Sequence, residues 1–326
     1  MTFATLTRSS LAAAALIALT QTASASAFDR VFAFGDSLTD NGNFFAATGG
    51  TYPPPPYFAG RFSNGPVAAE YMASQLGATL YDFAYGGAST GDLNADLTPA
   101  AGLLYFTGVL SQVAGFTSAA PPGAAGPGAL YMVWAGANDF LRAAPADFPA
   151  VGAAAIANLD SAAVSLYGVG ARDFLIPLMA DLGATPDVRA LGPGAAALAS
   201  FVSLSFNDGL KHSLEVLAAS LPGSHFMVYD TFAQQHLVLD HPGDFGLTNT
   251  TDPCFTGVSL CADASQYFFW DGVHPTTNVA KLIGIGLASA APEPSAMLLL
   301  ATAALALVGV GRKRRARTWA AHCVKS

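Results

Sequence analysis

The stretch Val31-Phe-Ala-Phe-Gly-Asp-Ser-Leu-Thr-Asp-Asn-Gly-Asn43 decides how this chain is interpreted. Its apolar residues, Val31–Phe34, are followed abruptly by Gly35-Asp36-Ser37. A short apolar run that stops in this way is typical of a buried parallel strand that brings a polar group to the edge of a sheet. In open α/β sheets, ligands bind beyond the carboxyl ends of the strands. Ser37 is therefore a candidate nucleophile, provided that the chain places a base within its reach.

Further apolar runs follow, and each ends in polar or Gly-rich residues. Strands are expected over 78–84, 130–134, 173–177 and 225–229, and helices over 66–76, 101–116, 149–167, 195–221, from 231 and over 276–287. Five strands that alternate with helices predict a parallel sheet covered on both faces, which is a three-layer α/β/α domain. Residues 41–65 contain four consecutive prolines, so we expect an ordered loop there, with Ser63 or Asn64 capping the next helix.

The two ends of the chain do not have the pattern of a folded domain. Residues 1–27 combine Arg8, an apolar run over 11–19 and small residues up to Ala27, which is typical of a secretory signal cleaved after Ala27. At the other end, the uncharged run 295–311 is followed at once by five cations. This pattern predicts a membrane segment whose basic flank faces the cytoplasm, with a hydrophobic core helix as the alternative. The domain is therefore expected to span 28–291.

The body of the chain is strongly acidic. Residues 28–291 contain seven of the 14 Lys and Arg and 21 of the 22 Asp and Glu, which gives a net charge of −14. Such a body cannot neutralise many phosphates, which argues against nucleic acid as a partner. Its two cysteines, Cys254 and Cys261, are expected to form a disulfide in an exported protein. A metal site is the weaker alternative, because further ligands at suitable spacing are missing.

Unusual polar residues follow the expected strands, and a parallel sheet brings them to one edge: Ser37, Gly86-Gly87, Asn138, and Asp271 with His274. Acyl transfer needs a histidine that takes the proton of the nucleophile and a carboxylate that orients the histidine. It also needs preorganised donors for the oxyanion, which the N–H groups of Ser37 and a glycine and the Asn138 amide could supply. Each residue alone is more often part of a turn or a helix cap, but their joint occurrence predicts a Ser37-His274-Asp271 triad.

Four short blocks carry a resemblance to a known family. Gly35-Asp-Ser-Leu38, Gly86-Gly87, Gly136-Ala-Asn-Asp139 and Asp271-Gly-Val-His-Pro275 resemble the sequence blocks of the GDSL lipase/esterase family, the SGNH hydrolases. The extended opening around Ser37 is similar to the phospholipase/lecithinase/haemolysin-like branch of that family. The resemblance implies a flavodoxin-like five-stranded parallel sheet, a serine-histidine-aspartate triad, and neither a metal nor a cofactor.

The glycine block departs from the family pattern in one place. It usually begins with Asn, whereas this chain has Asp82. By its spacing from that position, Gly87 is favoured over Gly86 as the oxyanion donor.

The C-terminal segment, 292–326, resembles a PEP-CTERM sorting signal, because Pro292-Glu-Pro294 precedes the apolar run and the basic end. The resemblance implies processing by an exosortase-type enzyme and delivery to the cell surface or the extracellular space. A permanent C-terminal membrane anchor is the alternative, and it would also leave the domain facing outward.

The expected function is that of an exported serine esterase or lipase that hydrolyses lipid or phospholipid esters. The acyl site is expected to involve aromatic residues of the loop after Ser37, namely Phe44, Phe45, Tyr52, Tyr57 and Phe58. The alternative substrate is an O-acetylated surface or matrix polysaccharide, whose sugar rings the same side chains would stack on. An alternative of another class is a non-catalytic matrix protein that reuses the fold, although the complete triad argues against it.

Overall fold

The computed structural model describes residues 28–95, 104–119, 126 and 128–291. The predicted signal segment, 1–27, and the predicted sorting segment, 292–326, lie outside these residues. Positions 101–103 of the helix expected over 101–116 also lie outside them.

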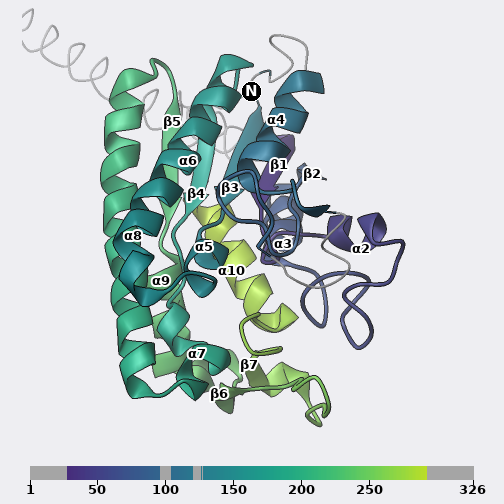
Figure 1. The fold of residues 1–326 in the computed structure, drawn as a ribbon. Coiled ribbons are helices and arrows are strands. Elements are labelled where there is room, and N and C mark those ends of the chain that lie inside the picture. The colour runs from purple at the N-terminus through teal and green to yellow at the C-terminus, as the bar shows by residue number, and fades with distance from the viewer. Residues whose placement is uncertain (1–27, 96–103, 120–125, 127, 292–326) are drawn as a thin grey trace, which may run out of the picture. The chain divides into compact units, whose positions relative to one another are not determined.

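A five-stranded parallel sheet forms the centre of the domain (Figure 1). Its strands, in chain order, are β1 (Arg30–Gly35), β2 (Thr79–Asp82), β3 (Ala129–Trp134), β4 (Asp173–Pro177) and β5 (His225–Tyr229). They are arranged in the order β2-β1-β3-β4-β5, and every neighbouring pair is parallel. This order is the flavodoxin-like one, so the structure confirms the predicted fold class.

The burial of the strands follows from their place in the sheet. All six residues of β3 are buried, and Val31, Ala33 and Phe34 of β1 are inaccessible to solvent. The edge strands β2 and β5 contain only exposed and half-buried residues. Helices cover the middle of a parallel sheet on both faces, so its central strands need apolar side chains on both sides.

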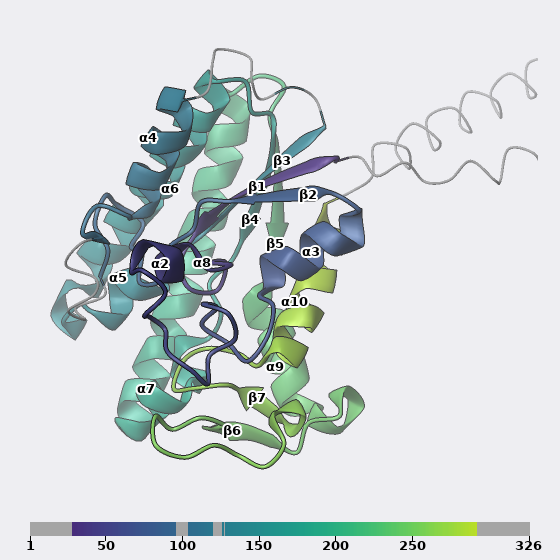
Figure 2. The same cartoon turned by 90° about the vertical axis from the view of Figure 1, so that its right-hand side faces the viewer.

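Helices cover the two faces of the sheet (Figures 1 and 2). One face is covered by α4 (Val109–Ala119), α6 (Phe148–Gly168) and α8 (Pro193–Ser220), and the other by α3 (Ala68–Leu76) and α10 (Thr277–Ala290). α10 lies directly against α3, because Gly284 has no side chain: a Cβ there would lie 2.6 Å from the Cβ of Tyr71. Since α10 begins three residues after His274, this packing fixes the end of the His274 segment.

Among the described residues, the segment 145–168 is long and apolar enough to cross a membrane. It consists of the 3₁₀ turn η3 (Pro145–Asp147) and α6, and it packs against α4 and α8. Ala155, Leu159 and Ala163 of α6 belong to the main core of the domain. These contacts are those of a helix in the outer layer of an α/β domain.

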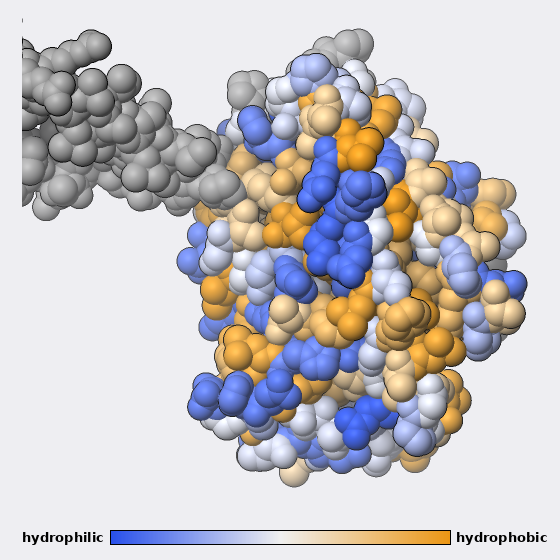
Figure 3. Space-filling view, turned by 90° about the vertical axis from the view of Figure 1, so that its left-hand side faces the viewer, coloured by the Kyte–Doolittle hydropathy of each residue, from blue (hydrophilic) through white to orange (hydrophobic). Residues whose placement is uncertain are grey.

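The outward face of α8 is shown in Figure 3, where apolar patches are separated by polar ones. Several large apolar side chains of α8 are exposed, namely Leu198, Phe201, Leu204 and Val216.

Shorter elements connect these layers. They are α2 (Asn43–Ala47), α5 (Ala137–Leu141), α7 (Pro186–Ala190), α9 (Thr231–Asp240) and the 3₁₀ turns η4 (Leu182–Ala184), η5 (Pro242–Phe245) and η6 (Ala264–Gln266). A separate two-stranded parallel sheet pairs β6 (Asn249–Pro253) with β7 (Tyr267–Phe269). Two of these features differ from the sequence expectation, because α2 interrupts the loop 41–65 and β6 lies within the excursion after α9.

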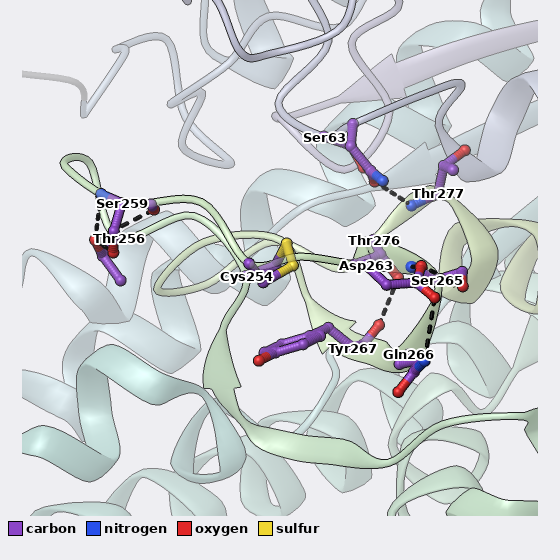
Figure 4. The surroundings of a disulfide bond; sticks show 12 residues. Ser63, Cys254, Thr256, Ser259, Asp263, Ser265, Gln266, Tyr267, Thr276 and Thr277 are labelled. Carbon is purple, nitrogen blue, oxygen red and sulfur yellow. Dashed lines mark hydrogen bonds between the residues drawn. A yellow bond between two sulfur atoms is a disulfide. The ribbon is translucent and has the colours of Figure 1, made fainter.

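The residues expected to cap α3 have a different role. The N-cap of α3 is Val67, whose N–H donates to a carboxylate oxygen of Glu70 at 2.9 Å. Asn64 Oδ1 instead accepts the N–H of Thr277, the first residue of α10, at 2.8 Å. Ser63 Oγ donates to the carbonyl of Pro275 at 2.9 Å, and Figure 4 shows Ser63 beside Thr277. The loop after Ser37 is thereby attached to the segment that carries His274.

Cys254 and Cys261 form a disulfide in the excursion between β6 and β7, which is the expected pairing (Figure 4). The N–H of Cys261 donates to the Cys254 carbonyl at 2.7 Å, so the disulfide loop (Cys254–Cys261) closes on itself. The N–H of Cys254 donates to the carbonyl of Phe269 at 3.0 Å. The loop is therefore attached to the chain two residues before Asp271.

Candidate active site

Ser37 lies in a tight turn directly after β1. Asp36 Oδ1 accepts the N–H of Leu38 at 3.0 Å, and the Asp36 carbonyl accepts the N–H groups of Thr39 and Asp40. Local hydrogen bonds of this kind favour turns at the positions that follow strands. The turn exposes the Ser37 hydroxyl at the wall of a cavity.

The structure brings the three predicted triad residues together. His274 Nε2 lies 2.7 Å from Ser37 Oγ, and His274 Nδ1 lies 2.7 Å from Asp271 Oδ2. In the tautomer that a general base requires, Nδ1–H donates to the carboxylate and Nε2 accepts the serine proton. Asp271 Oδ1 also accepts the N–H groups of Val273 and His274, at 3.0 and 2.8 Å. The sequence Asp271-Gly-Val-His274 thus forms a turn around its own carboxylate.

The electrostatics of the triad suit this proton transfer. Burial alone would raise the pKa of Asp271, but the charge and hydrogen bonds of His274 outweigh it and lower that pKa. Burial alone would lower the pKa of His274, but Asp271 outweighs it and raises that pKa above its ordinary value. Each group therefore stabilises the charged form of the other, which favours an imidazolium once Ser37 has lost its proton.

The two glycines after β2 differ in whether their N–H groups are free. The N–H of Gly86 donates to Asp40 Oδ2 at 2.8 Å, so it is already in use. The N–H of Gly87 donates to no acceptor within the described part of the chain, and Gly87 lines the cavity beside Ser37. Gly87 also has a φ of +77°, which favours glycine. This geometry fits Gly87, rather than Gly86, as the oxyanion donor.

Asn138 lies at the same edge, in the second position of α5 directly after β3. One amide hydrogen of its Nδ2 is donated to the Ala88 carbonyl at 3.0 Å. The other hydrogen is left for a ligand in the cavity, which Asn138 lines together with Ser37 and Gly87. The next residue, Asp139, accepts the N–H and the hydroxyl of Thr90 at 3.0 and 2.7 Å. α5 is therefore held against the loop that contains Gly87.

One buried carboxylate connects the Ser37 turn to the glycine block. Asp40 Oδ1 accepts the N–H groups of Gly42 and Asn43, and Oδ2 accepts those of Phe44 and Gly86. Asp40 is inaccessible to solvent, and burial raises its pKa despite these four bonds. Asp82, where the family pattern has Asn, likewise accepts the N–H groups of Asn41 and Ala84. It supports the same loop and does not line the cavity.

A cavity of about 580 Å³ opens beside Ser37. Its aromatic lining includes Tyr52, Tyr57 and Phe62 from the loop after Ser37, together with Trp134, Phe268 and Phe269. The cavity also has an aliphatic wall, which we define as Met179, Leu182, Val238, Val279, Leu282 and Ile283. This wall comes from the segment after β4 and from α9 and α10. A cavity of this size is typical of small-molecule sites.

The five residues expected to form the acyl site are not all at the cavity. Tyr52 and Tyr57 line it, whereas the structure places Phe44, Phe45 and Phe58 elsewhere. Phe44 is fully buried and packs against Tyr52 and Phe62, with ring centroids 5.7 and 5.9 Å apart. Phe45 packs on Gly60, where a Cβ would lie 2.4 Å from its own. Phe58 is 46% exposed and lies beneath the guanidinium of Arg61.

Two features of the site were missed by sequence reasoning. The aliphatic wall was missed because the apolar residues of α9 and α10 have the spacing of an ordinary core face. The hydroxyl of Tyr57 donates to Asp271 Oδ2 at 2.7 Å, a contact between residues 214 positions apart. The only signal for it was the concentration of aromatic residues around Tyr57.

Two histidines outside the triad, His225 and His236, each lie 2.9 Å from an aspartate carboxylate oxygen. His236 Nε2 lies 2.9 Å from Asp181 Oδ2, while Asp181 Oδ1 accepts from Gly183 and Ser200. In the part of the chain that the structure describes, no group of three or more His, Cys, Asp or Glu side chains could hold a metal ion.

Comparison with known proteins identifies one family over most of the chain. The sequence profile of the family described as GDSL-like lipase/acylhydrolase matches residues 31–286. The thermolabile hemolysin of Vibrio parahaemolyticus is 28% identical over 78% of this chain, which spans 62% of that protein's length. The phosphatidylcholine-sterol acyltransferase of Aeromonas hydrophila is 32% identical, and the match covers 74% of this chain and 70% of the acyltransferase. A GDSL esterase/lipase of Arabidopsis thaliana is 27% identical, and the match covers 76% of this chain and 84% of the plant protein.

Solved structures resemble the chain more distantly. An acetyl xylan esterase is 14% identical with a TM-score of 0.43, covering 81% of this chain and all of its own. A lipase from a goat rumen metagenome is 15% identical with a TM-score of 0.38, covering 81% of this chain and 98% of its own. Similarity at this level carries no information about the substrate.

Proposed function

The chain belongs to the GDSL-like lipase/acylhydrolase family, and from this premise we propose that it hydrolyses carboxylic esters of lipids through an acyl-Ser37 intermediate. The single observation that carries the proposal is the hydrogen-bonded series from Ser37 Oγ to His274 and Asp271, at the mouth of an apolar cavity. A serine hydroxyl is a weak nucleophile until an adjacent base activates it, and His274 is in hydrogen-bond contact with it.

The reaction would proceed in two halves. Ser37 Oγ attacks the ester carbonyl carbon while its proton passes to His274 Nε2, and Asp271 stabilises the imidazolium. The carbonyl oxygen becomes an oxyanion that the N–H groups of Ser37 and Gly87 and the Asn138 amide can bind. The bond to the leaving oxygen then breaks, and His274 returns the proton to the alcohol. A water molecule, activated by His274, hydrolyses the acyl-serine in the same way.

The aliphatic wall supports a long acyl chain over an acetyl group. Val238 and Val279 are almost fully buried, yet they line the cavity that also contains Ser37. Burial of apolar surface contributes about 0.8 kcal/mol for each methylene removed from water, so an acyl chain against this wall gains affinity with its length. An acetyl group would leave most of the cavity unfilled.

Arg142 supports a phosphate in the leaving group, as in a phospholipid. It is the only Lys or Arg that lines the cavity in the described part of the chain, and it forms no ion pair there. It lies four residues after Asn138, and residues at this spacing share a face of a helix. An anionic group attached to the leaving alcohol could therefore contact Arg142 while the carbonyl oxygen is bound at Asn138.

We further propose that the protein is exported. The signal-like residues 1–27 support this, as does the disulfide between Cys254 and Cys261, because disulfides persist in oxidising compartments. Membrane anchoring or exosortase processing of the segment 292–326 remains part of this proposal.

The proposal predicts that Ser37→Ala abolishes ester hydrolysis and leaves the fold intact. Removing a serine nucleophile from such a triad costs on the order of a millionfold in kcat, because attack and proton transfer are lost together. The test measures kcat/KM of the purified protein and of S37A on phosphatidylcholines, on p-nitrophenyl esters of acetate to palmitate, and on acetylated xylan, with circular dichroism as the control for folding.

A rise of kcat/KM with acyl length is the expected result for the purified protein. Hydrolysis confined to acetylated xylan would replace lipid with polysaccharide as the substrate. Undiminished hydrolysis by S37A would overturn the nucleophile, and a wild-type protein inactive on every ester would overturn the function.

A further inference from the structure

The hydroxyl of Tyr57 donates a hydrogen bond to Asp271 Oδ2, and the reaction steps described above give this contact no role. We propose that Tyr57 is a positioning residue, whose hydroxyl fixes the carboxylate of Asp271 in the orientation in which it holds His274. The catalytic part of this inference rests on the proposed function. Tyr57 lines the substrate cavity and also donates a hydrogen bond to Asp271.

The hydrogen bonds of Asp271 show what Tyr57 adds. Oδ1 is held by two backbone N–H groups of its own turn, those of Val273 and His274. Oδ2 accepts from His274 Nδ1 and from the Tyr57 hydroxyl, both at 2.7 Å, while Oδ1 lies slightly farther from His274 Nδ1, at 2.9 Å. Tyr57 is therefore the only donor to Asp271 from outside the turn among the described residues. Without it, Oδ2, the nearer of the two oxygens to His274 Nδ1, would keep His274 as its only donor among the described residues.

Tyr57 is suited to be a permanent donor. Burial raises the pKa of its hydroxyl well above the ordinary value, and the negative charge of Asp271 raises it further. The hydroxyl therefore stays protonated throughout the pH range in which an esterase works. A charge-assisted bond from O–H to carboxylate is among the stronger hydrogen bonds of proteins.

The ring of Tyr57 is held by other aromatic side chains. It makes edge contacts with Phe62, Phe255 and Trp270, with ring centroids 6.3, 5.7 and 6.0 Å away. Such contacts favour one ring orientation and add to the area that is buried. The hydroxyl is thus directed at Asp271 by packing, and does not depend on the hydrogen bond alone.

The same contacts attach the disulfide loop to the triad. Phe255 directly follows Cys254 and stacks on Trp270, with ring centroids 5.7 Å apart. The N–H of Phe255 donates to the Trp270 carbonyl at 2.6 Å, and the N–H of Trp270 donates to the His274 carbonyl at 2.7 Å. Residues from three distant stretches of the sequence therefore meet around Asp271.

Removing the hydroxyl should change the basicity of His274 in a defined direction. A donor to Asp271 reduces the negative charge that the imidazole experiences, so its loss raises the pKa of His274. The other charged groups that act on His274 are Asp36 and Asp187, and Tyr57→Phe leaves both in place. Because His274 must be neutral to act as the base, the acid limb of the pH profile should move to higher pH.

The test compares the full-length protein with Tyr57→Phe, which keeps the ring and removes only the hydroxyl. We expect kcat on a p-nitrophenyl ester to fall about tenfold at neutral pH with KM within about twofold, because His274 is less well oriented. The acid limb of kcat/KM should move up by about half a pH unit, because Asp271 stabilises the imidazolium more strongly. NMR titration of the His274 imidazole measures the same shift without using activity.

Tyr167→Phe is the matched control. Its hydroxyl donates to the Pro222 carbonyl at 3.0 Å, at the end of α6, so this variant also loses one tyrosine hydrogen bond. It should leave both the kinetics and the titration of His274 unchanged. An unshifted His274 titration in Tyr57→Phe, or an equal shift in Tyr167→Phe, would overturn the proposal. If no ester is hydrolysed at all, the titration still decides whether Tyr57 acts on the Asp271–His274 pair.

Discussion

The two sides of the cavity beside Ser37 are built from very different sequences. The aromatic arm, residues 44–62, contains six aromatic side chains, whereas most of the aliphatic wall comes from ordinary helical residues such as Val238 and Val279. Most rings of the arm pack against one another, whereas the wall combines core residues, such as Val238 and Val279, with the half-buried Leu282 and Ile283. Under the proposed function, the arm restrains the catalytic residues, and the wall is the surface available to an acyl chain. Richness in aromatic residues is a poor guide to where the substrate binds.

The largest effect is expected from Phe44→Ala in the arm. The side chain is fully buried between Tyr52 and Phe62, so its loss should leave a cavity and lower the free energy of unfolding by about 3–5 kcal/mol. Urea unfolding followed by fluorescence measures the change.

Phe58→Ala is the control within the same arm. Phe58 is 46% exposed, so its removal should change stability by less than about 0.5 kcal/mol. If instead Phe44→Ala kept full stability and altered acyl-chain preference, the aromatic arm, and not the aliphatic wall, would be the acyl site.

The next effect is expected from Val279→Phe in the aliphatic wall. Val279 is 2% exposed and lines the cavity, so a larger side chain should occupy space that a long acyl chain needs. We expect kcat/KM for palmitoyl esters to fall about a hundredfold, which is about 2.7 kcal/mol of transition-state stabilisation. Acetyl esters should lose little.

Val216→Phe, on the exposed face of α8, is the matched control, and it should leave the chain-length profile unchanged. Equal losses for acetyl and palmitoyl esters in Val279→Phe would mean that the wall supports the fold and does not select the acyl chain.

The smallest effect is expected from opening the disulfide. Cys254 and Cys261 close a short loop, and cross-links of this kind contribute about 2–3 kcal/mol to stability. Because Phe255 in this loop contacts Tyr57, reduction should lower kcat by a similar factor for every acyl length. Urea unfolding and the ester panel, each with and without dithiothreitol, measure both changes.

The double variant Cys254→Ser/Cys261→Ser should behave like the reduced protein and no longer respond to dithiothreitol. A change in acyl-chain preference on reduction would instead connect the disulfide loop to the aliphatic wall.

Much of the fold, and the meeting of Ser37, His274 and Asp271 at one edge of the sheet, could be predicted from the sequence because the relevant signals are local. A run such as Val31–Phe34 followed by Gly35-Asp36-Ser37 indicates both a strand and its polar end, and parallel strands place such ends together. The aliphatic wall could not be predicted, because the apolar spacing in α10 is the same whether its side chains face packed atoms or a void. The Tyr57–Asp271 contact is equally hidden, since it joins distant segments through one hydroxyl. The role of Asn64 was predicted wrongly for a related reason. Its side chain accepts the N–H of Thr277 in α10 and does not cap α3, the next helix in the sequence.

The four hydrogen bonds to Asp40 have a consequence for how the enzyme can diversify. This carboxylate connects the turn of Ser37 to the glycine block. A change at Asp40 would therefore move the nucleophile and the proposed oxyanion donor Gly87 together. None of the aliphatic wall residues takes part in that connection. Under the proposed function, substitutions of wall side chains leave the hydrogen bonds of Asp40 in place, so the range of accepted esters can change while Ser37 and the glycine block keep their positions.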